Sequence, residues 1–338
     1  MKRSIACVAA IGLLAASSAS AQKVDEFYSK TKLTLVVGGD AGGAHDAYAR
    51  LLQRHIVRHI PGNPVVIVQN MTGAGGVVAA NFIANVAPRD GSTIAALFPG
   101  NVVEPLLQKT NGANYDPRNL TWIGNIASLQ LACFTWFTNE VKTVEQARQT
   151  EVIMGGQNAG SGSGVLPFLM NQMLGTKFKI ITGYQTGDLR LALERGEIQG
   201  ICGLAYSTVL VSTPRWILEK KLNFIAQTGL KRSRDLPDTP IVSELAKNPE
   251  DAAIFRLLDI RDALGRPYVG PPGMPADRTE ALRAAFAKTM SDPAYLAEAK
   301  QAYQDIDFAD HTEMEGIIAE AYRMPADVVR RVSDLTHK

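Results

Sequence analysis

Residues 33–52 read LTLVVGGDAGGAHDAYARLL, and this stretch decides the class of fold. The run from Leu33 to Val37 is aliphatic and rich in β-formers, which predicts a short buried strand. A glycine-rich segment from Gly38 to Gly43 follows directly. From Tyr48 onward, apolar residues recur at the spacing of a helix face. A strand, a glycine-rich turn and a helix in this order begin a parallel βαβ unit.

The same order of segments recurs along the chain. Strand-like and helix-like pieces alternate through residues 65–98, and again through 152–204 after a long glycine-rich loop. Two such series predict two α/β lobes, each with its own sheet. The predicted first lobe is discontinuous and comprises residues 22–129 and 226–338. The predicted second lobe comprises residues 130–225.

The first 21 residues have the features of an export signal. Lys2 and Arg3 precede an apolar run over 5–16, and Ala19-Ser20-Ala21 forms an Ala-x-Ala cleavage site. The alternative is an uncleaved anchor helix, but the run is shorter than the ~20 residues that span a bilayer. We therefore expect residues 1–21 to be removed and the mature protein to be periplasmic.

The charge balance excludes two classes of partner. The chain has 35 Lys+Arg against 33 Asp+Glu, and removal of Lys2 and Arg3 leaves 35 − 2 = 33 against 33. Proteins that bind nucleic acid need a basic surface that displaces phosphate counterions. A polybasic membrane anchor needs a cluster of positive charge. A formally neutral mature chain favours neither of them.

Two cysteines remain after cleavage. Cys133 and Cys202 lie in strand-like apolar runs, and in an oxidising compartment they can form one disulfide. The other interpretation, which the apolar surroundings favour, is a pair of buried free thiols. A zinc site needs more ligands than two cysteines without a nearby histidine.

No enzyme motif is found. Gly160-Ser161-Gly162-Ser163-Gly164 has glycine where a nucleophile elbow needs serine. The glycine runs lack a P-loop lysine and the spacing of a dinucleotide fingerprint. His55 and His59 lie four residues apart, but the glutamate of a zincin helix is missing, which favours an ordinary helix face. We expect no metal, no cofactor and no catalytic residue.

Three glycine-rich loops follow strands and lead into helices: 38–46, 70–76 and 155–164. Ligands of open α/β sheets bind at this edge, and the N–H groups at a helix start attract anions. None of the three loops contains Lys or Arg. We therefore predict that backbone N–H groups, hydroxyls, amides and water hold a carboxylate there. The alternative is that the glycines only make tight turns.

Five segments together resemble one known family. They are Val36 to Asp46, Asn70-Met71-Thr72-Gly73-Ala74-Gly75-Gly76, Ala87-Pro88-Arg89-Asp90-Gly91-Ser92-Thr93, Leu236-Pro237-Asp238-Thr239-Pro240 and Gly270-Pro271-Pro272-Gly273-Met274-Pro275. In this order they are similar to motifs of the periplasmic solute-binding proteins of tripartite tricarboxylate transporters, the Bug or TctC-like receptors. The chain departs from the family's pattern at Gly38, where proline is usual, and at Met71-Thr72, which replaces Arg-Pro.

The resemblance implies a type II periplasmic-binding-protein fold, in which two α/β lobes close on a ligand cleft. Carried over residue by residue, it implies ligand contacts from the first glycine-rich loop, 38–46, from the glycine-rich loop of the second lobe, 155–164, and from Tyr184. Four residues are added: Asn101 and Ala205 are expected to line the cleft, Thr72 to supply a hydroxyl donor, and His45 to add polarity near the ligand. The candidate ligand-binding residues are Gly39, Gly42, Gly43, His45, Asp46, Thr72, Asn101, Ser161, Gly162, Ser163, Tyr184 and Ala205.

The function implied is capture of a small carboxylate and its delivery to the membrane subunits of a tripartite tricarboxylate-type transporter, by a protein that is monomeric. Two alternatives stay open. One is a periplasmic ligand sensor that feeds a membrane receptor, which the sequence does not separate from a transport protein. The other is a secreted α/β enzyme, which would need a reactive constellation that the sequence lacks.

Overall fold

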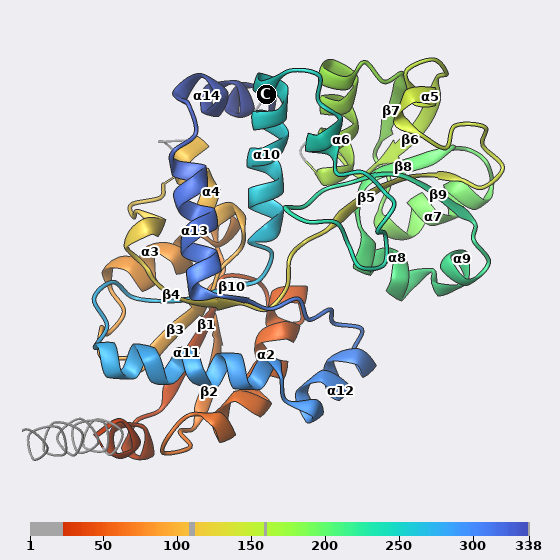
Figure 1. The fold of residues 1–338 in the computed structure, drawn as a ribbon. Coiled ribbons are helices and arrows are strands. Elements are labelled where there is room, and N and C mark those ends of the chain that lie inside the picture. The colour runs from red at the N-terminus through yellow and green to blue at the C-terminus, as the bar shows by residue number, and fades with distance from the viewer. Residues whose placement is uncertain (1–22, 108–111, 159–160, 337–338) are drawn as a thin grey trace, which may run out of the picture. The chain divides into compact units, whose positions relative to one another are not determined.

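The computed structural model describes residues 23–107, 112–158 and 161–336, so the predicted signal peptide 1–21 lies outside the described residues. The chain divides into two compact units. Unit 1 contains the chain up to Pro105, the segment that ends at Ala127, and Arg266–Ile318. Unit 2 is built mainly from Ser128–Gly265 and the chain from Ala319 onward. Figure 1 shows the elements of both units.

Unit 1 contains a six-stranded mixed sheet with the strand order β11-β4-β10-β3-β1-β2. Strand β1 pairs in parallel with β2 and β3, whereas β10 is antiparallel to β3 and β4. The strands are β1 (Leu33–Val37), β2 (Val66–Asn70), β3 (Thr93–Ala96), β4 (Thr121–Asn125), β10 (Pro267–Gly270) and β11 (Ala309–Asp310). The parallel centre of this sheet is therefore built from the segments that the sequence predicts as strands.

Helices α2 and α3 follow the parallel strands β1 and β2 through glycine-rich loops at the same edge of the sheet, because parallel strands share one carboxyl edge. The divisions of the chain after Pro105 and after Ile318 fall within α4 and α13. The helices are α2 (Ala44–Ile56), α3 (Val77–Asn85), α4 (Gly100–Leu107), α11 (Ala276–Met290), α12 (Pro293–Gln301) and α13 (His311–Tyr322). Short 3-10 turns are η1 (Val57–His59), η2 (Ala74–Gly76) and η3 (Pro117–Asn119).

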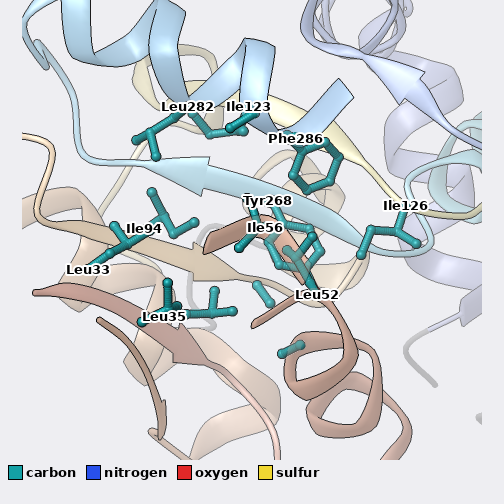
Figure 2. Close-up of a cluster of buried hydrophobic side chains, with 14 of the residues drawn as sticks. Leu33, Leu35, Leu52, Ile56, Ile94, Ile123, Ile126, Tyr268, Leu282 and Phe286 are labelled. Carbon is teal, nitrogen blue, oxygen red and sulfur yellow. The ribbon is translucent and has the colours of Figure 1, made fainter. Parts of the chain in front are cut away.

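The core of unit 1 lies between the sheet and the helices α2 and α11. Leu52 and Ile56 of α2 and Leu282 and Phe286 of α11 belong to one buried cluster with the strand residues, among them Tyr268 (Figure 2). Burial of side chains of this size contributes about 1.5–3 kcal/mol each relative to exposure. The cluster therefore fixes where α2 begins, and with it the loop that precedes α2.

Unit 2 contains a five-stranded mixed sheet with the strand order β7-β6-β8-β5-β9. Strand β6 pairs in parallel with β7 and β8, and β5 is antiparallel to β8 and β9. The strands are β5 (Leu131–Trp136), β6 (Val152–Gly156), β7 (Phe178–Thr182), β8 (Gly200–Ala205) and β9 (Leu222–Gln227). Each predicted lobe thus has a sheet of its own.

The helices of unit 2 include α10 and α14, which contact each other through Arg331 and the first turn of α10. The helices are α5 (Val144–Ala147), α6 (Gly162–Leu169), α7 (Thr186–Glu194), α8 (Tyr206–Ser212), α9 (Pro214–Leu218), α10 (Pro249–Ala263) and α14 (Ala326–Thr336). A π-helical turn, η4 (Met170–Leu174), continues α6, and a 3-10 turn, η5 (Val242–Leu245), precedes α10. A second buried cluster, which includes Phe134, Leu193, Ile201 and Trp216, forms the core of this unit.

Cys133 and Cys202 are joined by a disulfide bond. They lie directly opposite each other on the antiparallel strands β5 and β8. The sequence favoured two free buried thiols, and the structure instead shows the alternative. The reason is the register of the strand pair, which local apolar composition does not reveal.

The division into units differs from the predicted lobes, because residues 226–265 and the chain from Ala319 onward belong to unit 2 and not to the first lobe. The predicted boundary between residues 225 and 226 falls inside β9, which pairs with β5 in the sheet of unit 2. The chain returns to unit 1 only at Arg266, after α10. Among the helices of the described residues, none is long and apolar enough to cross a membrane.

Candidate functional site

The loop that joins β1 to α2 is held by a buried carboxylate. Asp46, in the first turn of α2, is 2% exposed, and its Oδ2 atom accepts hydrogen bonds from the Gly42 N–H and from the Arg50 guanidinium, both at 2.8 Å. Hydrogen bonding from Arg50, and also from Gly42 and Asn70, keeps the pKa of Asp46 below its ordinary value. This predicted ligand-binding residue therefore orders the loop through an ionised side chain.

Asn70 connects this loop to the end of β2. Its Nδ2 atom donates to the Gly39 carbonyl at 2.9 Å and to Oδ1 of Asp46 at 3.0 Å, while its Oδ1 atom accepts from Arg50 at 3.2 Å. The carboxyl ends of β1 and β2 are thus tied together by side-chain amide and carboxylate groups. Arg50 brings a positive charge to this end of the sheet, although the loops themselves contain none.

Phe98 fills the space between the loops of unit 1. A Cβ atom at Gly39 would lie 2.9 Å from the Phe98 ring, and one at Gly76 would lie 2.7 Å from the ring and 2.6 Å from Oδ1 of Asn101. Asn101 is buried, and its side chain accepts from the Phe98 N–H and donates to the Gly75 carbonyl. Glycine is therefore required at both positions by close packing, and Asn101 fastens the second loop.

The remaining predicted residues of unit 1 are more open. Gly42, Gly43 and Thr72 are exposed, and His45 is half-buried with its ring centroid 4.2 Å from that of Phe98. The structure therefore separates two groups among the predicted residues. Asp46 and Asn101 hold the loops from within, whereas Gly42, Gly43 and Thr72 are accessible to a ligand.

The corresponding loop of unit 2 is organised by two serines. Ser163 is buried and accepts from the Gln157 N–H at 3.0 Å, and its hydroxyl lies 3.1 Å from that of Ser161. Ser161 in turn donates to the Asn158 carbonyl at 2.8 Å. Both hydroxyls are engaged within the loop at the start of α6. Tyr184, the other predicted residue of this region, packs against the buried cluster of unit 2.

Glycines let the start of α6 approach strand β8. A Cβ atom at Gly162 would lie 2.8 Å from the Gly203 carbonyl oxygen, and one at Gly156 would lie 2.7 Å from that of Ser163. Gly203 itself has φ +90°, a conformation that favours glycine. The first turn of α6 therefore lies directly against the carboxyl end of β8.

A pocket of about 290 Å³ opens at this place in unit 2. It lies at the carboxyl ends of the parallel strands β6 and β8, where open α/β sheets bind ligands. Two predicted residues, Gly162 and Ala205, line it. Seven of the 14 lining residues are aliphatic, and the polar lining residues are Gln157, Thr208, Thr228, Arg261 and Asp262.

Arg261 and Asp262 are residues that the sequence analysis missed. They lie at the end of α10, far along the chain from the glycine-rich loop. Asp262 is buried, accepts a hydrogen bond from the Thr228 hydroxyl at 2.9 Å, and has its pKa raised to about 7 by that burial. No signal in the glycine motifs points to either residue, because only the packing of α10 brings them to the pocket.

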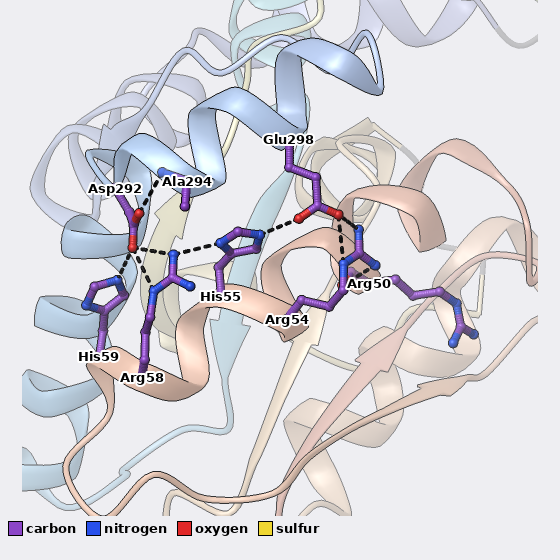
Figure 3. A network of polar contacts seen from close by, with 8 residues as sticks. All are labelled: Arg50, Arg54, His55, Arg58, His59, Asp292, Ala294 and Glu298. Atoms are coloured by element: carbon purple, nitrogen blue, oxygen red, sulfur yellow. Dashed lines mark hydrogen bonds and ion pairs between the residues drawn. The ribbon is translucent and has the colours of Figure 1, made fainter.

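The two histidines at helical spacing contact carboxylates of unit 1 (Figure 3). His59 lies 2.8 Å from the Asp292 carboxylate, and His55 contacts Glu298 through Nε2. Arg58 donates to Nδ1 of His55 at 2.8 Å, and since arginine only donates, the ring proton lies on Nε2. These contacts attach α2 and η1 to α12.

The histidine pair is thus explained by helix packing. Hydrogen bonds from Arg58 and His59 hold the pKa of Asp292 well below its usual range. Within the described parts of the chain, no group of three or more His, Cys, Asp or Glu side chains is placed to hold a metal ion.

The sequence matches a known family model over most of its length. The model of the tripartite tricarboxylate transporter family receptor, TctC, matches residues 48–333. The chain belongs to the TctC receptor family. Among curated relatives of this TctC receptor is the UPF0065 protein in the gbd 5′ region of Cupriavidus necator, which is 29% identical over 296 residues. The match covers 86% of this chain and 83% of that protein.

Solved structures of the family share the fold. A TctC solute-binding protein from Polaromonas without ligand has a TM-score of 0.72 at 20% identity, with 90% of this chain and 100% of that chain covered. Rpa4515 of R. palustris with adipate has a TM-score of 0.58 at 21% identity, with 90% and 97% covered. MatC of Rhodopseudomonas palustris with bound malate has a TM-score of 0.53 at 18% identity, with 91% and 99% covered.

These similarities confirm the predicted family and the predicted α/β fold class of periplasmic solute-binding proteins. The family and its structural neighbours are solute-binding proteins and not enzymes, so the alternative of a secreted enzyme is set aside.

Proposed function

We propose that this TctC receptor captures a small aliphatic carboxylate in the periplasm and delivers it to the membrane subunits of a tripartite tricarboxylate-type transporter. Family membership supports the class of protein. The adipate and malate in two structures of the same fold support the class of ligand. The predicted export signal 1–21 supports the location.

The single observation that carries the proposal is the pocket of unit 2. It combines aliphatic walls with a few polar groups, which is the composition of small-molecule sites. Its place at the carboxyl ends of β6 and β8, beside the first turn of α6, matches where the sequence predicts an anion. A short carbon chain with a carboxylate fits this lining better than a highly charged or aromatic ligand does.

The proposed contacts of unit 2 come from Gly162 and Ala205, with Ser161 and Ser163 ordering the loop. Those of unit 1 come from the exposed residues Gly42, Gly43 and Thr72. Other residues of unit 1 are proposed to hold its loops in place and so to position these contacts: Gly39, His45, Asp46 and Asn101.

A binding screen tests the function. The mature chain from Gln22 is mixed with adipate, malate, citrate and benzoate, each beside its uncharged amide, and thermal unfolding is followed. A ligand that binds only the folded state at 100 times its Kd adds about 2.7 kcal/mol of stability. We expect a rise in Tm with at least one aliphatic carboxylate and none with its amide. If no carboxylate raises the Tm, the proposed function is wrong.

A further inference from the structure

We propose that Arg261 binds the carboxylate of the ligand directly, as the cation of the unit 2 pocket. This inference rests on the proposed function and deepens it. It replaces the expectation that only backbone N–H groups, neutral side chains and water hold the anion, an expectation that followed from the absence of Lys and Arg in the glycine-rich loops.

The two arginines of α10 differ in what they contact. Arg256 forms two hydrogen bonds to the Glu320 carboxylate, at 2.7 Å and 3.1 Å. The Arg261 side chain makes no hydrogen bond and no ion pair with any described residue, and its Nε atom is buried. Arg261 is half-buried and lines the pocket. Arg256 is thus paired with a carboxylate of unit 2, whereas Arg261 lines the pocket.

A half-buried guanidinium without an anion is costly to the folded protein. It carries five N–H donors and remains charged at every physiological pH. Withdrawal of such a group from water is unfavourable unless an anion replaces the lost hydration. A ligand carboxylate accepts two parallel hydrogen bonds from the fork of the guanidinium, which is the strongest common geometry for this pair.

The neighbours of Arg261 leave it available for an external anion. Asp262 follows it in the sequence, and the Arg261 charge opposes part of the rise in the Asp262 pKa. The two side chains form no ion pair, and Oδ2 of Asp262 accepts a hydrogen bond from Thr228. Burial raises the pKa of Asp262 to about 7, which lessens its repulsion of an anion. Gln157 and Thr208 add neutral polar groups, and Leu131, Leu166 and Leu204 supply apolar walls.

The test compares Arg261→Gln with Arg256→Gln, a matched control on the same helix. Affinity for each carboxylate of the panel is measured by titration calorimetry on the mature protein. Loss of a charged, bidentate contact is expected to weaken binding by roughly 10- to 100-fold in Arg261→Gln. The control, whose arginine lies outside the pocket, should keep the affinity of the wild type within about threefold.

A second readout separates binding from folding. In the wild type the carboxylate should bind more tightly than its amide, and this preference should shrink in Arg261→Gln. Arg261→Lys keeps the charge but not the forked guanidinium, so its affinity for the carboxylate should lie between those of the wild type and Arg261→Gln. If Arg261→Gln folds poorly, the affinities of the wild type and Arg261→Lys for the carboxylate are compared instead. Equal affinities would contradict a direct contact between Arg261 and the carboxylate.

The outcomes also separate the two proposals. If the wild type binds a carboxylate and Arg261→Gln keeps the same affinity and the same preference over the amide, Arg261 does not bind the ligand. The proposed function is then unaffected. A wild type that binds no carboxylate refutes both.

Discussion

The Asn70 side chain donates a 3.0 Å hydrogen bond to the Asp46 carboxylate, and this bond links the end of β2 to the first turn of α2. The same carboxylate holds the Gly42 N–H, so the two glycine-rich loops of unit 1 depend on one another. An acidic residue in the first turn of a helix is also stabilised by the helix dipole. Asp46 is therefore the residue on which the order of these loops rests.

Replacement of Asp46 should destabilise the fold. Asp46→Ala removes a buried acceptor and leaves the Gly42 N–H and the Asn70 amide without it, which should cost about 2–4 kcal/mol in urea unfolding at pH 7. Because the folded-state pKa of Asp46 is lowered, its contribution is fully present above the unfolded pKa of about 4. The contribution is lost as the pH falls through the folded pKa.

The matched control is Asp40→Asn, which changes an exposed carboxylate of the same loop and should alter stability by less than about 0.5 kcal/mol. Equal stabilities of Asp46→Ala and this control at pH 7 would contradict the structural role of Asp46.

Two adjacent glycines should respond differently to alanine. Gly75 and Gly76 both have positive φ, but a Cβ atom at Gly75 meets nothing within 4 Å, whereas one at Gly76 strikes Phe98 and Asn101. Gly76→Ala should therefore cost about 1–3 kcal/mol more than Gly75→Ala, since overpacking adds to the shared backbone strain. Thermal unfolding of both variants measures the difference, and a Gly75→Ala variant as unstable as Gly76→Ala would argue against the clash.

The disulfide between Cys133 and Cys202 predicts how many free thiols the purified protein contains. A chain that begins at the predicted cleavage site, Gln22, contains only Cys133 and Cys202. Such material, purified without reductant, should show no free thiol in denaturant and a mass about 2 Da below that of the reduced chain. Cys202→Ser serves as the control, because it should expose one titratable thiol from Cys133. Two reactive thiols in the wild type would favour the free-cysteine interpretation.

Removal of the Asp262 charge should stabilise the protein at high pH. Its folded-state pKa of about 7 lies above the unfolded value of about 4, so the folded state binds the extra proton between these values. Stability then falls as the pH rises from about 4 to 7. Asp262→Asn keeps an acceptor for the Thr228 hydroxyl and lacks this penalty, so it should gain on the order of 1–3 kcal/mol at pH 8.

The gain should shrink toward pH 5, where wild-type Asp262 is already protonated. Asp238→Asn changes an exposed carboxylate of the same unit and should show no such trend. A gain from Asp262→Asn that is constant from pH 5 to pH 8 would contradict the raised pKa.

Local sequence patterns were sufficient to predict the strands and helices around the candidate site. The aliphatic run of β1 and the apolar spacing of α2 predict their positions, because strand and helix periods are properties of short segments. The pairing partner of β9 was not predictable in this way. The sheet that receives it depends on contacts with β5 that are distant in sequence.

The sequence by itself determined the glycine positions of the loops, since Gly39, Gly76 and Gly162 stand where a side chain would strike a neighbour. It also determined that these loops carry no basic residue. Only the tertiary structure decided that a cation is nevertheless present, because α10 packs within unit 2 and brings Arg261 to the pocket beside Gly162. The physical reason is that helix packing is set by buried apolar area over the whole unit, whereas a motif records only its own few residues.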